Sequence, residues 1–460
     1  MSGNTISLLI ACLMTIPLLG AETKLTLSDC IHRAVQANLT LQSQSLEKQQ
    51  KNLDQRIAAK VFIPVFSMDQ SFQSGSKLSD IYTVSGKLHS STRYSLKSGV
   101  DRAGTIDYKT ASFELTEPLL KNFGRRVADL DLELSRIDYR IAVELFRDEL
   151  NSFIRTVADN YLNLCLDRQI LVIQEKAYDR ALKQYEDTRH DIGNGVLAEQ
   201  EIYLVEENLI SFESKKKDAS HNIVIQEMEL KRILEIGVAD ETSLIPVDSI
   251  EEAISPGLFS DSCHKMQLDN PVLKIKNLTM EKSNKNYDYY QNMLLPELNL
   301  YFKRSVSWPD STTGSGRDAS SDSGFFMELP FSNAPDRSSL DKSELDREIT
   351  RRNFTEEKQS LDYELRKLFS EIEYQQGNLA LRKKGTLLAE KKLEAETEKY
   401  RNGISTLADV VLFQREFESA QIDEKSIAVQ LCKLFLKKRY LEGTLYQDYG
   451  IQLMDINSKL

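Results

Sequence analysis

The sequence predicts a mainly α-helical protein that also carries short membrane β-strands and is built twice from one plan. Three observations support this fold class. A glycine turn followed by an apolar helical series occurs twice, each half holds a proline followed by segments that alternate apolar and polar residues, and each half then continues as a long region without proline. Because the order is the same in both halves, we predict two structural repeats, residues 22–245 and 246–460.

The glycine turns are the clearest sign of duplication. Gly195 and Gly403 lie 208 residues apart, and each ends a predicted helix in the way that glycine commonly does. The apolar residues that follow are spaced three, four, three residues apart, which is the spacing of a coiled-coil seam. They are Ile202, Val205, Leu209 and Phe212 in the first half, and Val410, Phe413, Phe417 and Ala420 in the second.

The start of each half is also repeated. A helix from about Leu25, capped by Ser28 or Asp29, is expected to run to about Lys60, where Pro64 ends it. A second helix of the same kind begins near Asp261. The other predicted elements are β-hairpins at 64–118 and 296–331, long helix pairs at 126–236 and 338–446, and a linker at 237–257.

Segments of about ten residues with period-two alternation follow the prolines, and this is the length of a tilted strand that crosses a bilayer. We predict one hairpin in each half, hence four strands, with polar loops between outgoing and returning strands. In the first loop, Arg93-Tyr94-Ser95-Leu96 is a candidate for an extra extended segment. The residues predicted to face lipid are Phe66, Met68, Phe113, Leu115, Leu298, Leu300, Phe302 and Trp308.

Composition excludes several classes of function. The net charge of −11 argues against a nucleic acid partner, which would require a basic surface. After the N-terminal segment, no run of eighteen apolar residues exists that would form a transmembrane helix. No phosphate loop, nucleophile elbow or metal-ligand spacing occurs, so we expect neither an enzyme nor a cofactor. The five widely spaced cysteines are expected to be single buried thiols.

The N-terminal segment 1–21 resembles a secretory signal peptide. Ile6–Leu19 is apolar, and small residues precede a cleavage position near Ala21. Two alternatives are open: lipidation at Cys12, and a buried N-terminal helix.

Four strands per chain imply assembly. An open sheet edge cannot exist in lipid, and eight strands are the practical minimum for a membrane barrel. Several copies must therefore share one barrel, and three copies with four strands each would give twelve strands. The helices would then enclose a continuous cavity below it.

At this point the sequence resembles the TolC-like outer-membrane factors, the exit ducts of efflux pumps and type I secretion systems. The resemblance covers nearly the whole chain after residue 21. It rests on the stretch from Leu25 to Leu41, the stretch from Leu115 to Arg126, and the two glycine turns with the acidic residues after them. It implies a homotrimer in the outer membrane of a diderm bacterium, with a twelve-stranded barrel, a periplasmic helical tunnel, a periplasmic adaptor (membrane fusion) protein and an inner-membrane pump or ABC transporter as partners.

The resemblance also implies roles for individual residues. The gate would contain Asp409, Tyr400, Gln200 and Glu201, although Asp409 and Glu201 also fit as acids of a first helical turn and Tyr400 as a packing residue. Leu412 and Ser405 stand where some members carry a second acid and a basic gate residue. The adaptor would dock on the tips Asn194, Gly195, Val196, Asn402, Gly403 and Ile404.

Two further interpretations come from the residues themselves. Charge runs such as Lys215-Lys216-Lys217 are expected to be solvated helix faces. The alternative function is a coiled-coil envelope scaffold or adhesin that conducts nothing; the alternating strands next to prolines favour the duct.

Overall fold

In the computed structural model, each half of the chain begins with a helix that an asparagine interrupts. Helix α1 (Leu27–Ala37) gives way to α2 (Leu39–Ala59) at Asn38, and α6 (Phe259–Asp269) gives way to α7 (Pro271–Met293) at Asn270. The Asn38 side-chain oxygen accepts a hydrogen bond from the Leu41 amide at 2.9 Å, and that of Asn270 accepts one from the Leu273 amide at 3.1 Å. The sequence similarity at these positions therefore reflects a repeated helix cap, and the single helix expected up to Lys60 is in fact two.

The structure describes residues 22–73, 76–103, 106–237, 242–248, 257–309, 316–329, 332 and 334–451. The predicted signal peptide 1–21 and Cys12 lie outside them. The chain divides into two units, and each draws on both halves of the sequence. The helical unit contains the described residues of Met1–Leu41, Leu150–Met266 and Tyr363–Leu460, and the sheet unit contains those of Gln42–Glu149 and Gln267–Asp362.

The N-terminal cap of α1 differs from the prediction. Thr26, not Ser28 or Asp29, is the capping residue, and its hydroxyl accepts a hydrogen bond from the Asp29 amide at 3.2 Å. The same hydroxyl donates to the Asp29 carboxylate at 2.7 Å. Asp29 therefore completes a reciprocal capping pair.

A small parallel sheet joins the beginnings of the two halves. Strand β1 (Glu22–Leu25) pairs with β6 (Ser243–Pro246), which lies inside the segment predicted to be a linker. Tyr161 fastens this sheet to a long helix, because its hydroxyl donates to the Leu25 carbonyl at 3.0 Å. Arg168, on the same helix, donates to the Leu244 carbonyl at 2.8 Å. The residues around Leu25, Leu244 and Tyr161 belong to the main apolar core of the helical unit.

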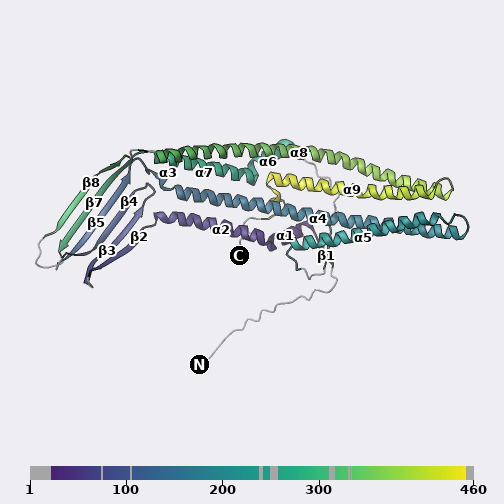
Figure 1. The fold of residues 1–460 in the computed structure, drawn as a ribbon, viewed down its shortest axis with the longest axis horizontal. Helices are drawn as coiled ribbons and strands as arrows, with labels where there is room; N and C mark the ends of the chain where they lie inside the picture. Colours follow the sequence, from purple (N-terminus) through teal and green to yellow (C-terminus); the bar gives the residue numbers. More distant parts are fainter. Residues whose placement is uncertain are drawn as a thin grey trace, which may run out of the picture. The chain divides into compact units, whose positions relative to one another are not determined.

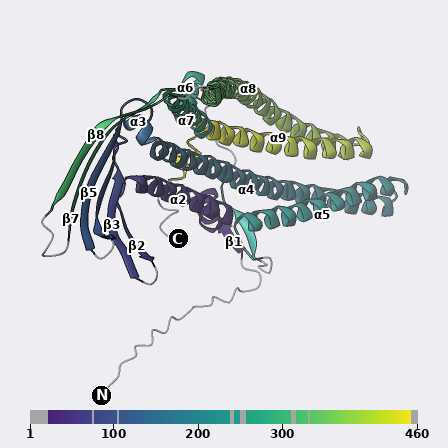
Figure 2. The same cartoon turned by 60° about the vertical axis from the view of Figure 1, so that its left-hand side comes forward.

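The sheet unit contains one antiparallel sheet of six strands rather than the four that were predicted. The first half contributes four strands instead of two, because the expected loop between Ser74 and Ile106 holds two additional strands. Figures 1 and 2 show the six strands side by side in one layer, in the order β2-β3-β4-β5-β7-β8. Their bounds are β2 Val65–Gln73, β3 Ser76–Lys87, β4 Arg93–Ala103, β5 Ile106–Pro118, β7 Glu297–Pro309 and β8 Asp318–Glu328.

Two long helix pairs follow the strands. Helix α4 (Leu130–Gly193) turns back into α5 (Glu201–Ile233), and α8 (Ala334–Arg401) turns back into α9 (Leu407–Glu442). Both views show α5 beside the C-terminal part of α4, and α9 beside the C-terminal part of α8 (Figures 1 and 2). Three short elements complete the fold: η1 (Lys60–Phe62), α3 (Arg125–Ala128) and α10 (Leu445–Asp448).

The cap at Asn270 is predicted to contribute measurably to stability. Replacing it by alanine removes the acceptor for the Leu273 amide and should lower the free energy of unfolding by about 1 kcal/mol. Asn270→Ser, which keeps a side-chain oxygen, should lose clearly less. Denaturant unfolding of the full chain in detergent measures both, and equal losses for the two variants would contradict the capping role.

Candidate functional site

Both helix pairs turn through the same backbone motif at their tips. Gly195 has φ +73° and Gly403 has φ +72°, the left-handed conformation that glycine adopts without strain. The Gly195 amide donates to the Ile192 carbonyl at 2.9 Å, and the next amide, of Val196, donates to the Asp191 carbonyl at 2.9 Å. Gly403 and Ile404 repeat this pattern with Tyr400 and Lys399, both also at 2.9 Å. Each tip is therefore a Schellman motif, as the glycines predict.

An apolar residue is left exposed at each of these turns. In a Schellman motif the residue after the glycine often packs against the last turn of the helix. Here the helix residues at that place are polar, Asp191 and Lys399, and Val196 and Ile404 are 71% and 76% exposed. Asn194 and Asn402, the other tip residues, are exposed as well. The two tips thus present the same small apolar knob to the surroundings.

Asp409 lies in the first turn of α9. Thr406 caps this helix: its hydroxyl accepts a hydrogen bond from the Asp409 amide at 3.3 Å and donates to the Asp409 carboxylate at 2.6 Å. The hydrogen bond from Thr406 holds the pKa of Asp409 below its ordinary value. In the single chain, Asp409 therefore has the capping role that the sequence left open, and its carboxylate stays ionised.

Ser405, at the second tip, forms a hydrogen bond to the last part of α8. Its hydroxyl donates to the Glu396 carboxylate at 2.5 Å, and Lys399 contacts the same carboxylate at 3.0 Å. These hydrogen bonds, that of Ser405 first, lower the pKa of Glu396. Leu412, in contrast, is exposed.

Tyr400 lies at the second tip, within the electrostatic influence of two acids of the first. Its ring packs against the apolar cluster of Leu393, Val410 and Phe417. Burial raises the pKa of its hydroxyl, and the negative charges of Asp191 and Glu201 raise it further. The structure therefore brings two of the predicted gate residues, Tyr400 and Glu201, into one electrostatic neighbourhood. Gln200 is exposed at the start of α5, where its side chain makes no capping hydrogen bond.

A polar seam between α5 and α9 was not predicted. Asn208 is buried between the helices, donates to the Gln414 side chain at 3.2 Å and accepts from Arg415 at 3.0 Å. Asn208 and Gln414 stand directly beside Leu209 and Phe413 of the apolar heptad series. Buried amide pairs of this kind fix the register of packed helices. The seam therefore sets how the two helix pairs match along their length.

The second part of the seam is centred on a buried carboxylate. Glu418 is only 4% exposed, and its oxygens accept hydrogen bonds from Gln174 at 2.6 Å and Lys215 at 2.7 Å. Lys215 was expected to lie on a solvated face, and its side chain is 39% exposed, but it also binds the buried Glu418 carboxylate. Lys217 of the same run pairs with Glu213 on the helix surface. The physical reason for the Lys215 contact is that a buried carboxylate needs a cationic partner.

The difference between the two lysines is testable. Lys215→Ala leaves the Glu418 carboxylate buried with one donor fewer and should destabilise the full chain by about 1–3 kcal/mol. Lys217→Ala, two residues away on the same helix, removes an exposed pair and should change stability little. Urea unfolding in detergent distinguishes them, and equal midpoints would show that Glu418 does not depend on Lys215.

One face of the sheet carries most of the apolar strand residues, although Lys109 and Arg304 also lie on it. The strand register pairs Phe66 with Val84, Leu115 with Phe302 and Leu300 with Phe325, so apolar residues follow one another across the strands. All eight residues predicted to face lipid lie on this one face by register, namely Phe66, Met68, Phe113, Leu115, Leu298, Leu300, Phe302 and Trp308. Their shared orientation agrees with the predicted alternation.

The described residues contain no group of three or more histidine, cysteine or acidic residues placed to hold a metal ion. Cys30, Cys165, Cys263 and Cys432 form no disulfide bond with one another; the first two are buried, as expected, and the last two are half-buried. Within the described ranges, no helix combines the length and the apolar character needed to span a bilayer.

Comparison with known proteins supports the resemblance inferred from the sequence. Residues 263–431 match the family model described as outer membrane efflux protein. Similar solved structures include the CmeC outer membrane channel of Campylobacter jejuni, with 14% identity, a TM-score of 0.65, and coverage of 94% of this chain and 89% of that one. No curated protein sequence matches this chain.

Two further channels show the same likeness. The outer membrane protein VceC of Vibrio cholerae has 13% identity and a TM-score of 0.67, covering 91% of this chain and 96% of that one. The open state of the MtrE outer membrane channel of Neisseria gonorrhoeae has 15% identity and a TM-score of 0.65, covering 91% and 89%. The chain therefore has the fold of these outer membrane channels, which confirms the predicted fold class, with the number of strands per chain corrected from four to six.

Proposed function

We propose that this chain is the outer-membrane exit duct of a tripartite export system, passively conducting substrates across the periplasm and outer membrane. The observation that carries the proposal is the sheet with a mainly apolar face, interrupted by Lys109 and Arg304, and two open edges, β2 and β8. A soluble scaffold has no use for exposed apolar residues on most alternate positions of its strands. In a bilayer the same face would contact the lipid chains, and the polar face would line a water-filled channel.

The open edges support assembly from several copies. Unpaired backbone N–H and C=O groups cost several kcal/mol each in hydrocarbon, so the sheet must close on itself. Six strands fall short of the practical minimum of eight for a membrane barrel. The resemblance to outer-membrane factors favours three copies. It also favours export through a signal peptide at 1–21, two repeats at 22–245 and 246–460, and an outer-membrane location.

The gate is proposed to lie near the helix tips. Asp409 and Glu201 are acids of the first turns of α9 and α5. Gln200 directly precedes Glu201, and the charge of Glu201 raises the pKa of Tyr400. Around a threefold axis, three copies of such carboxylates would form a ring that attracts cations and repels anions. Opening like an iris would require the α8–α9 pair to shift against α4–α5, which loosens the polar seam at Asn208 and Glu418.

The tips are proposed to dock a periplasmic adaptor protein, which in turn joins an inner-membrane pump or ABC transporter. Val196 and Ile404 are exposed apolar residues on otherwise polar turns, and exposed apolar residues supply much of the energy of a protein contact. Three copies would present six such residues. A ring of small apolar knobs fits a partner that offers matching helical hairpins.

A conductance measurement tests the duct. The purified full-length chain should insert into planar bilayers as a trimer and give discrete current steps, small in the resting protein and larger in Tyr400→Phe. A non-conducting scaffold would give none. The duct is excluded if trimers form but Tyr400→Phe, Asp409→Ala and their combination all fail to produce current.

Ion selectivity tests the role of Asp409. Asp409→Asn removes the charge from the proposed ring and should reduce the preference for cations, seen as a shift of the reversal potential in a salt gradient. Asp29→Asn is the matched control, since Asp29 makes the same capping contacts with Thr26 at α1. An equal effect of the two variants, or none, would place the selectivity elsewhere.

The pH dependence of this preference follows from the pKa of Asp409. The hydrogen bond from Thr406 lowers that pKa below 3.8, so the carboxylate is still ionised when the pH falls to about 5. The part of the cation preference that Asp409→Asn removes at neutral pH should therefore persist at pH 5 and disappear only at lower pH. Its loss between pH 7 and pH 5 would argue that another group carries it.

A further inference from the structure

The additional hairpin of the first half, β3 and β4, continues the sheet without interruption. Strand β3 pairs with β2 over nine residue pairs and with β4 over nine, and β4 pairs with β5 over eleven. Every neighbouring pair is antiparallel. The second half has no counterpart, because β7 connects directly to β8. The open edges of the sheet are consequently β2 and β8, and β3 and β4 are interior strands.

The alternation of apolar and polar residues also continues through this hairpin. On β3, Tyr82 and Val84 stand opposite Met68 and Phe66 of β2. On β4, Leu96 stands opposite both Val84 and Phe113. The other face carries mostly polar residues: Thr83, Ser85, Ser95 and Lys97, with Ile81 as the exception. A hairpin lying free in water would not need its apolar residues in register with those of its neighbours.

Glycines at two positions are fitted to the β3–β4 pairing. A side chain at Gly99 would meet the Asp80 carbonyl oxygen at 2.1 Å, so only glycine permits this close approach of β4 to β3. Gly86 lies opposite Tyr94 and against its ring. The pair β7–β8 has the same arrangement, with Gly324 opposite Tyr301. Tyrosine over a cross-strand glycine is a known stabilising device in sheets.

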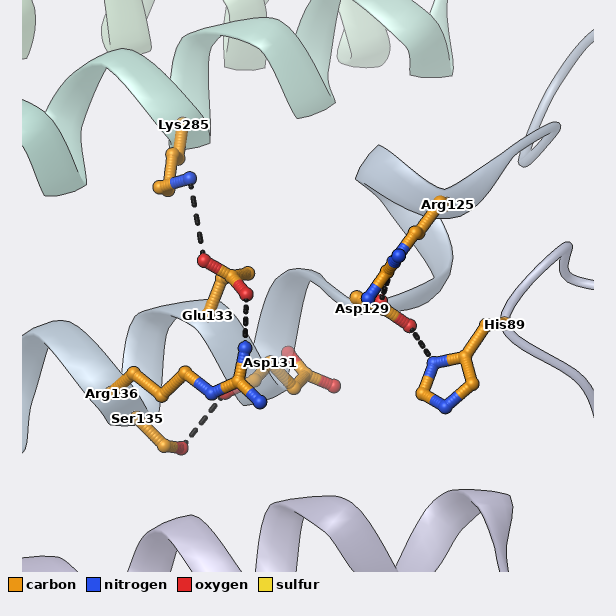
Figure 3. A network of polar contacts seen from close by, with 8 residues as sticks. All are labelled: His89, Arg125, Asp129, Asp131, Glu133, Ser135, Arg136 and Lys285. Carbon is orange, nitrogen blue, oxygen red and sulfur yellow. Dashed lines mark hydrogen bonds and ion pairs between the residues drawn. The ribbon is translucent and has the colours of Figure 1, made fainter.

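The turn between β3 and β4 is tied to the rest of the sheet unit. Figure 3 shows His89, from this turn, directed at Asp129 at the start of α4, with 2.5 Å between His89 Nδ1 and the carboxylate. Arg125 holds the same carboxylate at 2.9 Å. Burial raises the pKa of Asp129, but the hydrogen bonds from His89 and Arg125 outweigh it and hold this pKa low. His89 also stacks on Phe62 at 4.0 Å.

Two neighbouring residues of the turn are buried. Ser91 and Thr92 are almost inaccessible, and the Thr92 hydroxyl bonds to the Glu117 carboxylate at the end of β5. The hairpin is therefore anchored at its turn as well as along both strands. These are the contacts of a strand pair in the interior of a sheet.

We infer that the barrel of this protein contains eighteen strands, with β3 and β4 of each copy in its wall. The inference rests on the proposed trimer: three copies with six strands each give eighteen instead of twelve. Because the six strands alternate in direction, β8 runs opposite to β2, and β8 of one copy can pair with β2 of the next in the same antiparallel order.

The additional strands have a consequence for the pore. Barrel diameter grows roughly linearly with strand number, so eighteen strands give a barrel about 1.5 times as wide as twelve. The wider barrel would pass bulkier cargo through the outer membrane than a twelve-stranded duct, provided that the helical gate opens. The hairpin thus determines which size of substrate the outer-membrane section admits.

Cysteine pairs in the full-length chain test the strand order. Leu96→Cys with Phe113→Cys should form a disulfide on mild oxidation in outer-membrane vesicles, because β4 lies next to β5. Phe66→Cys with Phe113→Cys should not, because two strands separate β2 from β5. Leu115→Cys with Phe302→Cys is the control that must cross-link in either arrangement. Peptide mass spectrometry identifies each disulfide against the parent chain with its own cysteines.

Three results are distinguishable. Cross-linking of the first pair and the control, together with eighteen strands counted by electron cryomicroscopy of the trimer, supports the inference. Cross-linking of Phe66→Cys with Phe113→Cys in a conducting trimer overturns it while leaving the proposed function intact. Absence of any trimer overturns the proposed function itself. If the cysteine variants fail to reach the membrane, the strand count of the unmodified trimer decides alone.

Discussion

The backbone of an edge strand cannot remain unpaired in lipid, and this constraint governs the fold. The sheet unit ends in two such edges, β2 and β8, and nothing else in the described part of the chain pairs with them. Proteins in water can protect an edge with charges or a bulge, but a bilayer offers no solvent to replace the missing hydrogen bonds. With the outer-membrane location proposed above, the number of strands in one copy requires that several copies join. The apolar face, the polar face and the alternating strand directions all serve that closure.

Because the sequence is duplicated, the same local motifs occur in both halves of the chain. The same Schellman turn ends α4 and α8, and an asparagine divides the leading helix of both halves. The two halves differ in the hydrogen bonds at their tips. The second tip has the Thr406 cap and the Ser405–Glu396 hydrogen bond, while Gln200 at the first tip makes no such cap. The two otherwise similar helix pairs therefore differ in how their tips are held.

The sequence predicted well those features that a single residue or a strict period determines. The glycines fixed both tips, and the period-two alternation placed all eight apolar strand residues on one face. It failed where a third segment decides. Of the expected loop, only Arg93-Tyr94-Ser95-Leu96 at the start of β4 was a candidate extended segment. The rest of β3 and β4 is rich in serine, lysine and aspartate, and its pairing becomes visible only beside β2 and β5. The ion pair of Lys215 with Glu418 was missed because the two residues lie 203 residues apart in the sequence. The Thr26 cap was overlooked because Ser28 and Asp29 offered the same chemistry nearby.

The parallel pair β1–β6 bears on the order in which the molecule can form. Residue 22 must meet residue 243, so the amino-terminal strand stays without its partner until more than half of the polypeptide has been delivered. Such distant pairings are slow to form, because a long loop must close first. Until then, the core around Leu25 and Tyr161 is incomplete and its apolar residues remain exposed. In the export from the amino end proposed above, the helical unit would therefore be completed late.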